Sequence, residues 1–596
     1  MSQDIDSTTA PLTAKSVPMG PKTGIGTTPP HAFSFSELWY YFRLILGPEA
    51  RYFWMAVVFG VAISVLTLAV PISVQMVIDT IANTALVQPL IVLSLALFGL
   101  LALSALLMAL RTHLLEIYGR RAYARLVSEF SLQAIYAQAP FFEEVKRDGL
   151  FHRYFDIMTL QRSMPEILIG GFSIILQAVI GFAVVSLYHP VFLAFNLVLI
   201  LLLFLVWQIW GPGAIRTGID LSHAKYETAK WLSHLGETNG FYKSDHHIGF
   251  ALQRSEELTA NYIKKKKAHF RRNFAQTIGL LFLYATASAA LLALGGWLVI
   301  RGQLSLGQLV AAELIMSAIF VGMSQFDSYL KRFYYVCMAI DEIGLVYKIP
   351  LENTAGRLLL DDKVCDLRFD QVAKTVRRRE AVLDIVIPGG VKVRARAEDD
   401  ALQRLFTNLL KRHELPDRGW ITLAGYDLME CDVHRLRQEV VVIDRPMVAD
   451  CSIEEYLSLA ASAEATRGQM FDVLRMVGID DIVKSFDKGL DTVMSPLGLP
   501  LSPEETMRLQ LAAALLADPH ILVLNESCDV IEQAVLERVL DHIVAERDMT
   551  VVFFSNHHSL PQLDHRLWLG WDRQRLSLVD SSAAAGAEAV TGAQAE

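Results

Sequence analysis

The chain has 596 residues, of which 53% are hydrophobic and 20% are charged, and its formal net charge is −9. Soluble domains average about 45–50% apolar and about 25% charged residues, so this composition favours a membrane protein. The acidic balance argues against a nucleic-acid-binding protein. The five scattered cysteines, without a CxxC pair, predict reduced structural thiols and no metal site.

The chain opens with a polar segment that is rich in Thr, Pro and Gly, residues 1–32. It has no apolar core, so we expect a disordered tail without a signal peptide and without a peptidase domain. Residues 33–50, FSFSELWYYFRLILGPEA, mix aromatic and charged residues. This mixture predicts a short elbow helix in the membrane interface.

Six apolar runs follow, and each is long enough to cross about 30 Å of hydrocarbon as a helix. They predict a six-helix transmembrane domain over residues 51–335. The runs are 54–78, 87–110, 166–188, 190–210, 276–300 and 305–325.

The links between the runs alternate between very short and long. The long links, after the second and fourth runs, are rich in Lys and Arg. Positive loops mark the cytoplasmic side, so both chain ends are expected there. The long links also have helical composition, which predicts membrane helices that extend into the cytoplasm and turn near Pro140–Gly149 and near Gly236–Gly249.

Glu313 is a charge about two turns into the sixth run. A charge at membrane depth is costly and usually faces the protein interior or a water path. Glu313 is therefore a candidate for the transport pathway, or a partner for a polar group of another span.

After a linker at residues 336–356, short apolar segments alternate with amphipathic helices up to residue 579. This alternation predicts an α/β domain, residues 357–579, with a largely parallel sheet. Residues 580–596 form an Ala-rich tail that we expect to be disordered. The predicted strands are VLDIVI (382–387), VVVI (440–443), ILVL (521–524) and VVFF (551–554).

Several local sequences, together with the order of the segments, carry a family resemblance. They are IPGG (387–390), GWITLAGYDL (419–428), LRQEVVVIDRP (436–446), LSPEETMRLQLAAALLADPHILVLNES (501–527), VVFFSNHHSL (551–560) and, in the spans, LGGWLVIRGQLSLGQLVAAEL (294–314). They resemble a half-transporter of the ABC exporter family, closest to type I secretion exporters. The resemblance implies a membrane α-helical domain of six transmembrane helices followed by an α/β, P-loop-NTPase-like nucleotide-binding domain.

The phosphate-binding positions depart from the family pattern. A P-loop needs G-x-x-x-x-G-K-[ST], because backbone N–H groups, the lysine and the hydroxyl bind phosphate and magnesium. The corresponding slot, RAEDDALQR (396–404), contains Asp399 and Leu402 and has no Gly, Lys, Ser or Thr. Val376 stands where the adenine-stacking aromatic would lie.

The remaining motif positions are also altered. Ser502 is kept in the signature, but Pro503 and Glu504 replace its glycines, which puts a ring without an N–H and a carboxylate where the γ-phosphate would bind. Asp444 takes the Q-loop position, and Asn525 replaces the aspartate that orients magnesium. Glu526 remains as the residual general base. Asn556 takes the switch-histidine position, although a slip of one residue would place a histidine there.

These departures predict a pseudo-ATPase with a degenerate nucleotide-binding domain and no cofactor of its own; ATP and Mg²⁺ would come only through a partner. We expect an inner-membrane dimer, with an ATP-competent second half, that exports a polypeptide or lipid-like substrate. A periplasmic adaptor is a candidate partner, and nucleic acid is not expected. The alternatives are a nucleotide-independent homodimeric channel, assembly or regulatory protein, and an active ATPase with an unorthodox site.

Overall fold

The computed structural model describes residues 35–83, 87–139, 141, 150–358, 365–558 and 560–578. The chain divides into two compact units. The helical unit comprises Met1–Ile135 and Asp148–Lys348, and the α/β unit comprises Tyr136–Arg147 and Ile349–Glu596. The sequence boundaries 1–32 and 580–596, and most of the predicted turn at 140–149, lie outside the described residues.

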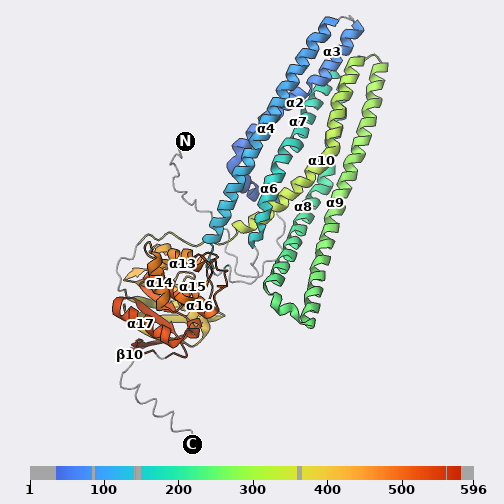
Figure 1. Ribbon diagram of the computed structural model, residues 1–596. Coiled ribbons are helices and arrows are strands. Elements are labelled where there is room, and N and C mark those ends of the chain that lie inside the picture. The colour runs from blue at the N-terminus through green and yellow to red at the C-terminus, as the bar shows by residue number, and fades with distance from the viewer. Residues whose placement is uncertain are drawn as a thin grey trace, which may run out of the picture. The chain divides into compact units, whose positions relative to one another are not determined.

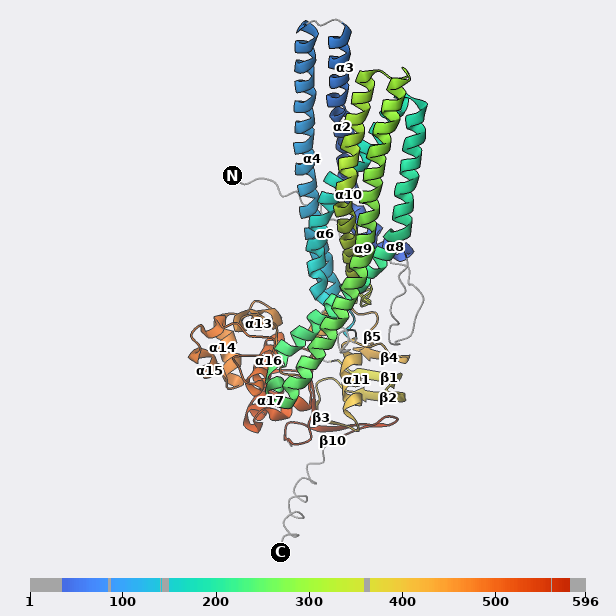
Figure 2. The ribbon, with the colours of Figure 1, turned by 90° about the vertical axis from the view of Figure 1, so that its right-hand side faces the viewer.

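Long helices make up the helical unit and run alongside one another in both views (Figures 1 and 2). Six of its helical segments, within the described residues, are long and apolar enough to cross a membrane. In chain order the elements are α1 (Phe35–Leu46), η1 (Gly47–Glu49), α2 (Ala50–Thr67), α3 (Ala69–Asn83), α4 (Val87–Ile135), η3 (Leu150–Arg153), α6 (Tyr154–Glu166), η4 (Ile167–Gly171), α7 (Phe172–Tyr188), α8 (Pro190–Glu237), η5 (Asn239–Lys243), α9 (Asp245–Ile300) and α10 (Leu306–Tyr347).

The predicted extension of the membrane helices is confirmed. Helix α9 has 56 residues, which is about 84 Å at 1.5 Å per residue and far exceeds the bilayer core. Helices α8 and α9 lie side by side and are joined through η5, within the turn predicted near Gly236–Gly249 (Figure 1).

The first predicted span is interrupted, which the hydropathy pattern does not indicate. Helix α2 ends at Thr67 and α3 begins at Ala69. The cause is Pro71, because its ring lacks an N–H and clashes with the carbonyl four residues earlier, at Thr67.

Two sheets make up the α/β unit. A six-stranded sheet has the order β10-β9-β3-β8-β7-β6 and is parallel except for the β9–β10 pair. A four-stranded antiparallel sheet has the order β2-β1-β4-β5. The strands are β1 (Leu367–Val376), β2 (Arg379–Ile387), β3 (Lys392–Ala397), β4 (Arg418–Leu423), β5 (Tyr426–Asp427), β6 (Val440–Ile443), β7 (Ile521–Leu524), β8 (Thr550–Phe554), β9 (His565–Leu569) and β10 (Gln574–Leu578).

One strand prediction is wrong in its partner. The segment VLDIVI lies in β2, which pairs with β1 in the antiparallel sheet rather than joining the parallel one. An apolar run indicates burial but not the direction of the neighbouring strand. The parallel position next to β8 is taken by β3, KVRARA, whose alternating charges conceal it in the sequence.

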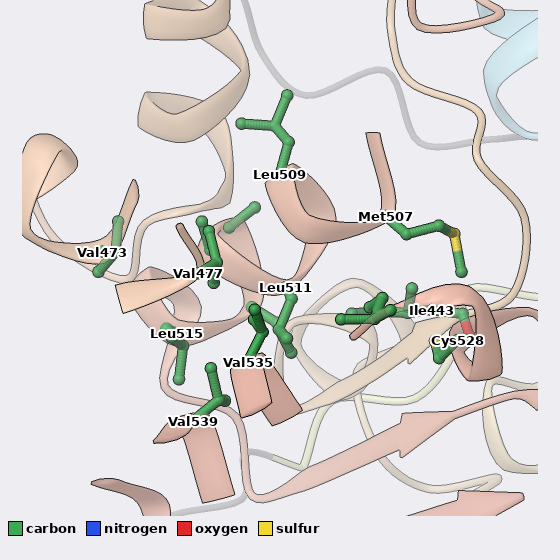
Figure 3. Close-up of a cluster of buried hydrophobic side chains, with 14 of the residues drawn as sticks. Ile443, Val473, Val477, Met507, Leu509, Leu511, Leu515, Cys528, Val535 and Val539 are labelled. Atoms are coloured by element: carbon green, nitrogen blue, oxygen red, sulfur yellow. Dashed lines mark hydrogen bonds between the residues drawn. The ribbon is translucent and has the colours of Figure 1, made fainter. Parts of the chain in front are cut away.

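Helix α16, which begins at the signature position, and strand β7, which ends just before Asn525 at the magnesium-orienting (Walker B) position, pack on one apolar core. Figure 3 shows Leu511 and Leu515 of α16 close to Val535 and Val539 of α17. Because these side chains are almost fully buried, the positions before α16 and after β7 are fixed. The helices of the α/β unit are α11 (Asp400–Leu410), α12 (Val433–Glu439), α13 (Ile453–Ala460), α14 (Arg467–Met476), α15 (Asp480–Ser485), η6 (Gly489–Asp491), α16 (Pro503–Ala517), η7 (Glu526–Val530) and α17 (Gln533–Glu546).

Where the linker enters the α/β unit, its residues accept hydrogen bonds from arginines at the ends of α11 and α12. The Arg437 guanidinium donates to both carboxylate oxygens of Glu352, each at 2.8 Å, and Arg412 donates to Asn353 O at 3.0 Å. His413 Nδ1 lies 3.2 Å from Arg437 Nη2. Burial, followed by the charges of Arg437 and Lys411, lowers the pKa of His413 to about 4.

We expect the α/β unit to lose stability in mild acid because of His413. Its folded pKa, about 4, lies below the ordinary value of 6.5, so the unfolded chain binds the proton first as the pH falls. The stability that the α/β unit has with His413 neutral is fully present above about pH 7, and it is lost as the pH falls from about 6.5 to 4. Discounted for partial exposure, it is on the order of 2 kcal/mol.

Urea unfolding of the full chain at pH 7 and pH 4.5 checks this expectation. His413→Gln should lose much of the pH dependence, while His434→Gln, at an exposed position on α12, should keep it. Equal pH dependence in both variants would rule out His413 as the source.

Candidate functional site

The turn between β3 and α11, where the P-loop would lie, consists of Glu398 and Asp399 alone. Asp399 has extended backbone angles, and its Oδ1 accepts a hydrogen bond of 2.7 Å from Ala401 N. Leu402 points into the core and is fully buried. A turn of two residues cannot provide the successive backbone N–H groups that a P-loop presents to phosphate. The chain's own carboxylate occupies the start of this helix.

At the signature position, too, side chains of the chain cap the start of the helix. Ser502 and Glu505 form a capping box, in which Ser502 N donates to Glu505 Oε2 at 2.7 Å and Glu505 N donates to Ser502 Oγ at 3.3 Å. Pro503 is the first helical residue and has no N–H to offer. Glu504 forms an ion pair with Arg508. The N–H groups of Ser502 and Glu505 are therefore engaged by the chain itself, and Pro503 replaces a third.

The Walker B and Q-loop positions are paired with each other. Asn525 is 4% exposed, and its Nδ2 donates to Asp444 Oδ1 at 2.7 Å. Arg445 Nε lies 3.4 Å from the other oxygen of Asp444. The amide thus binds the carboxylate, which an aspartate at the same position could not do.

Glu526, the residual general base, is bound to the switch position. Asn556 Nδ2 donates to Glu526 Oε1 at 3.0 Å, and Asn556 O accepts from Arg396 Nη2 at 3.0 Å. Asn556 N donates to Asp529 Oδ2 at 3.1 Å. We call the residues Arg396, Glu526, Asp529 and Asn556, joined by these three hydrogen bonds, the switch network.

The two histidines that follow do not replace Asn556 as the partner of Glu526. His557, which a slip of one residue would bring to the switch position, is exposed. The His558 ring, two positions after Asn556, stacks on Phe553, and its Nε2 lies 3.2 Å from Asp529 O. Asn556 is the residue that contacts Glu526.

Val376, at the adenine position, is the last residue of β1 and packs partly buried against the core. The turn that follows places Arg377 and Arg378 at φ 47° and 70°. Arg379 lies over the Trp571 ring, with its Cζ 4.6 Å from the centroid. No part of this hairpin presents an aromatic face at Val376.

Two residues that organise these regions are not among the candidates that the sequence predicts. Arg396, at the start of the P-loop slot, connects β3 to the loop after β8. In the helical unit, Arg111 is 1% exposed and donates to Ser173 Oγ at 2.7 Å and to Ile169 O at 3.1 Å. Ile169 belongs to η4, a π-helical turn, so Arg111 satisfies a carbonyl of an irregular segment. An arginine directly after an apolar run was the available signal.

Glu313 lies on α10, and its Oε2 is buried without a hydrogen-bond partner among the described residues. The role of Glu313 in the transport pathway stays a prediction. Within the described part of the chain, no three His, Cys, Asp or Glu side chains gather as a metal site would require.

Reverting Asn525 to the family's aspartate is expected to destabilise the α/β unit. Asn525→Asp replaces the donor to Asp444 with a second carboxylate at hydrogen-bond distance, in a buried position. We expect a loss of about 2 kcal/mol at pH 7 that shrinks as the pH falls toward 4, because one carboxyl then protonates.

Thermal unfolding of the full chain measures this loss. The double variant Asn525→Asp with Asp444→Asn exchanges donor and acceptor and should recover most of the stability. A single variant as stable as the parent would contradict the pairing of these two side chains.

The comparisons with known proteins agree with this fold. Residues 53–223 match the family described as "ABC transporter transmembrane region". A bacterial Atm1-family ABC exporter with ATP bound superposes with a TM-score of 0.73 at 17% identity, covering 92% of this chain and 99% of that one. The chain thus has the fold of an ABC exporter, and it is a multi-pass integral membrane protein.

Among its sequence relatives are proteins named for toxin translocation. The alpha-hemolysin translocation ATP-binding protein HlyB of Escherichia coli O157:H7 is 24% identical over 286 residues, 46% of this chain and 40% of that protein. The Toxin RTX-III translocation ATP-binding protein of Actinobacillus pleuropneumoniae is 22% identical over 487 residues, 80% of this chain and 68% of that protein. The alignment with the first relative thus spans less than half of that relative's length.

Proposed function

We propose that this chain is a subunit of an ABC-type exporter whose α/β unit is a pseudo-ATPase, a folded platform that does not itself bind or hydrolyse ATP. One observation carries the proposal. Both helix N-termini at which phosphate would bind, those of α11 and α16, are capped by side chains of the chain. Asp399 Oδ1 accepts from Ala401 N at α11. At α16, Ser502 Oγ accepts from Glu505 N, and the Glu505 carboxylate accepts from Ser502 N. Anions favour helix N-termini, so a triphosphate would have to displace these side chains and approach further acids.

The positions that bind magnesium in this fold are also changed. A P-loop hydroxyl and the Walker B aspartate usually bind the ion. The corresponding positions here lie in the buried core around Leu402 and at the amide of Asn525. Glu526 alone gives a base without a bound phosphate to act on. We therefore propose that ATP and Mg²⁺ reach the assembly only through a partner subunit.

We propose that the chain works as a dimer with an ATP-competent half in the inner membrane, with both termini cytoplasmic. The relatives are named for toxin translocation, which favours export of a polypeptide, and a lipid-like substrate is the second candidate. A periplasmic adaptor would fit this class of exporter.

A second candidate function is a nucleotide-independent homodimeric channel, assembly factor or regulator. The observation that favours it is the switch network, which links β3 and the loops after β7 and β8 by hydrogen bonds within the chain. Such a unit would be rigid on its own.

ATP hydrolysis by the chain in proteoliposomes, alone and with copurified membrane partners, tests these functions. The proposal expects no activity above that of the Glu526→Gln variant when the chain is alone, and ATP-dependent activity once a P-loop-bearing half is present. Activity of the chain alone that Glu526→Gln abolishes would overturn the proposal. A stable, ATP-insensitive homodimer that is still required for export would favour the second candidate.

A further inference from the structure

Three strands at one end of the six-stranded sheet carry a face rich in arginine. The order β10-β9-β3 places these strands side by side, and Val393, Ala395 and Leu567 turn their side chains to the apolar core that includes α11. Because side chains alternate along a strand, the residues between them point to the opposite face. Those residues, which we call the arginine face, are Arg394, Arg396, Arg566, Trp568, Arg575 and Ser577.

The strand register arranges the arginine face in two rows across the strands. The first row is Arg394, Arg566 and Ser577, and the second row is Arg396, Trp568 and Arg575. Neighbours within a row are about 4.8 Å apart along the hydrogen-bonding direction, and the two rows are about 6.7 Å apart along the strands. The guanidinium groups of β3, β9 and β10 therefore share one surface with a single indole ring.

The positive charges of the arginine face lack counterions. Arg396, Arg566 and Arg575 are exposed, and within the part of the chain that the structure describes no ion pair involves an arginine of this face. Burial, and then the charges of Arg396 and Arg566, lower the pKa of Arg394. The carboxylate of Asp529 opposes this effect. Like charges directly opposite each other on neighbouring strands are destabilising, so an anion bound between Arg394 and Arg566 would relieve their repulsion.

The hydrogen-bonding capacity of the β3 arginines is largely unused. Arg394 Nε is buried and has no hydrogen-bond partner among the described residues. Arg396 Nη2 donates to a neutral group, Asn556 O, at 3.0 Å. Side-on pairing with a carboxylate uses Nε together with one Nη, so Arg394 keeps the donors for such a pair available. A buried donor without a partner is costly, and a bound acceptor would remove that cost.

The spacing of the two rows matches the side chains of an extended polypeptide. Alternate side chains on one side of an extended chain are about 6.7 Å apart, which is also the distance between the rows. Carboxylates at two such positions would meet Arg394 and Arg566 in the first row and Arg396 in the second. Guanidinium groups bind carboxylates in bidentate, charge-assisted pairs. The chemistry that complements this face is therefore that of an acidic polypeptide segment.

Other occupants complement the arginine face less well. Proteins that bind single-stranded nucleic acid stack successive bases on several aromatic rings, whereas Trp568 is the one ring of this face. A chain of net charge −9 also repels a long polyanion. In a two-fold contact through the same face of two copies, arginines would meet arginines, so the like charges disfavour a second copy.

We propose that the arginine face binds an extended, acidic segment of a protein partner, with Arg394 and Arg566 as the central pair. The proposal goes beyond the pseudo-ATPase role and does not depend on it, because this binding needs no nucleotide.

Fluorescence anisotropy of a labelled short peptide of alternating Glu and Gly tests the proposal, with the full chain in a non-ionic detergent. We expect saturable binding that weakens as the salt concentration rises, because salt screens exposed charges. Arg394→Gln and Arg566→Gln should each weaken binding about three- to ten-fold, the effect of one charge-assisted pair. A peptide with Gln in place of every Glu should not bind.

Matched variants separate the arginine face from general attraction and from misfolding. Lys488→Gln removes a charge at an exposed position before η6 and should leave the affinity unchanged. Arg566→Lys keeps the charge but loses the bidentate geometry, so its affinity should lie between those of the parent and Arg566→Gln. Arg394→Gln and Arg566→Gln relieve a like-charge pair, so their unfolding temperatures should equal or exceed that of the parent.

Several results would overturn the proposal. No saturable binding at low salt, or an equal loss of affinity in Lys488→Gln and Arg566→Gln, would remove the role of this face. Tighter binding of an oligothymidylate through the same arginines would make the face a nucleic-acid site. Peptide binding that appears only when the chain is diluted to a monomer would show that a second copy covers the face.

Discussion

Arg437→Ala is expected to lower the free energy of unfolding of the α/β unit by about 3 kcal/mol. The guanidinium makes two hydrogen bonds of 2.8 Å to Glu352 and donates from Nε to Lys411 O at 3.1 Å. Glu352 is only about 10% exposed, so the alanine variant leaves a largely buried carboxylate without its partner. Removal of one member of a buried pair typically costs about 3–5 kcal/mol, and the partial exposure of Arg437 reduces that figure.

Arg435→Ala is the matched control for this variant. Arg435 lies on the same helix α12, and its pair with Glu439, at 3.5 Å, is solvent-exposed on the arginine side. Such pairs contribute about 0–1 kcal/mol. Urea unfolding of the full chain, followed by hydrogen exchange in the α/β unit, should separate the two variants. Equal losses would show that the linker is not held by Arg437.

Glu342→Ala is expected to destabilise the helical unit by about 3–5 kcal/mol. Glu342 lies on α10 and is fully buried, and its Oε2 accepts a hydrogen bond of 2.7 Å from Arg153 Nε. His223 Nε2 lies 3.9 Å from its other oxygen. The alanine variant would leave the guanidinium of Arg153, itself 16% exposed, without a counterion inside the helix bundle.

The unfolding temperature in detergent measures this effect. Glu342→Gln keeps an acceptor for Arg153 and should lose less than Glu342→Ala. Glu257→Ala removes an exposed pair with Arg254 on α9 and should change the temperature little. If Glu342→Ala were as mild as Glu257→Ala, the buried pair would not be holding α10 to η3.

The sequence was a good guide where burial is uniform. Strands β6, β7 and β8 were placed to within one residue, because each is a short run of consecutive apolar side chains. The six spans were recognisable for the same reason. Both features depend on composition over a window, which the sequence states directly.

The sequence predicts an element less well where its neighbours in space determine its position. Strand β3 reads KVRARA, and only its position between β8 and β9 explains why its charges are tolerated: alternate residues face the core while Arg396 faces the switch network. The partner of β2 and the break at Thr67 depend likewise on neighbours in space or on a single proline.

At the candidate site the sequence indicated which groups are missing but not what replaces them. That Asn525 binds Asp444, and that Asn556 joins Glu526 to the loop after β8, follows only from tertiary structure. The prediction that the α/β unit binds no nucleotide stays a prediction, now with a stated physical basis in two occupied helix N-termini.

Direct titration of the purified full chain with Mg²⁺–ATP, in parallel with an ATP-competent ABC exporter, tests the central claim. The account predicts no saturable binding up to millimolar nucleotide, and no rise in unfolding temperature. Saturable binding below that range, lost when Glu526 or Ser502 is replaced, would contradict it.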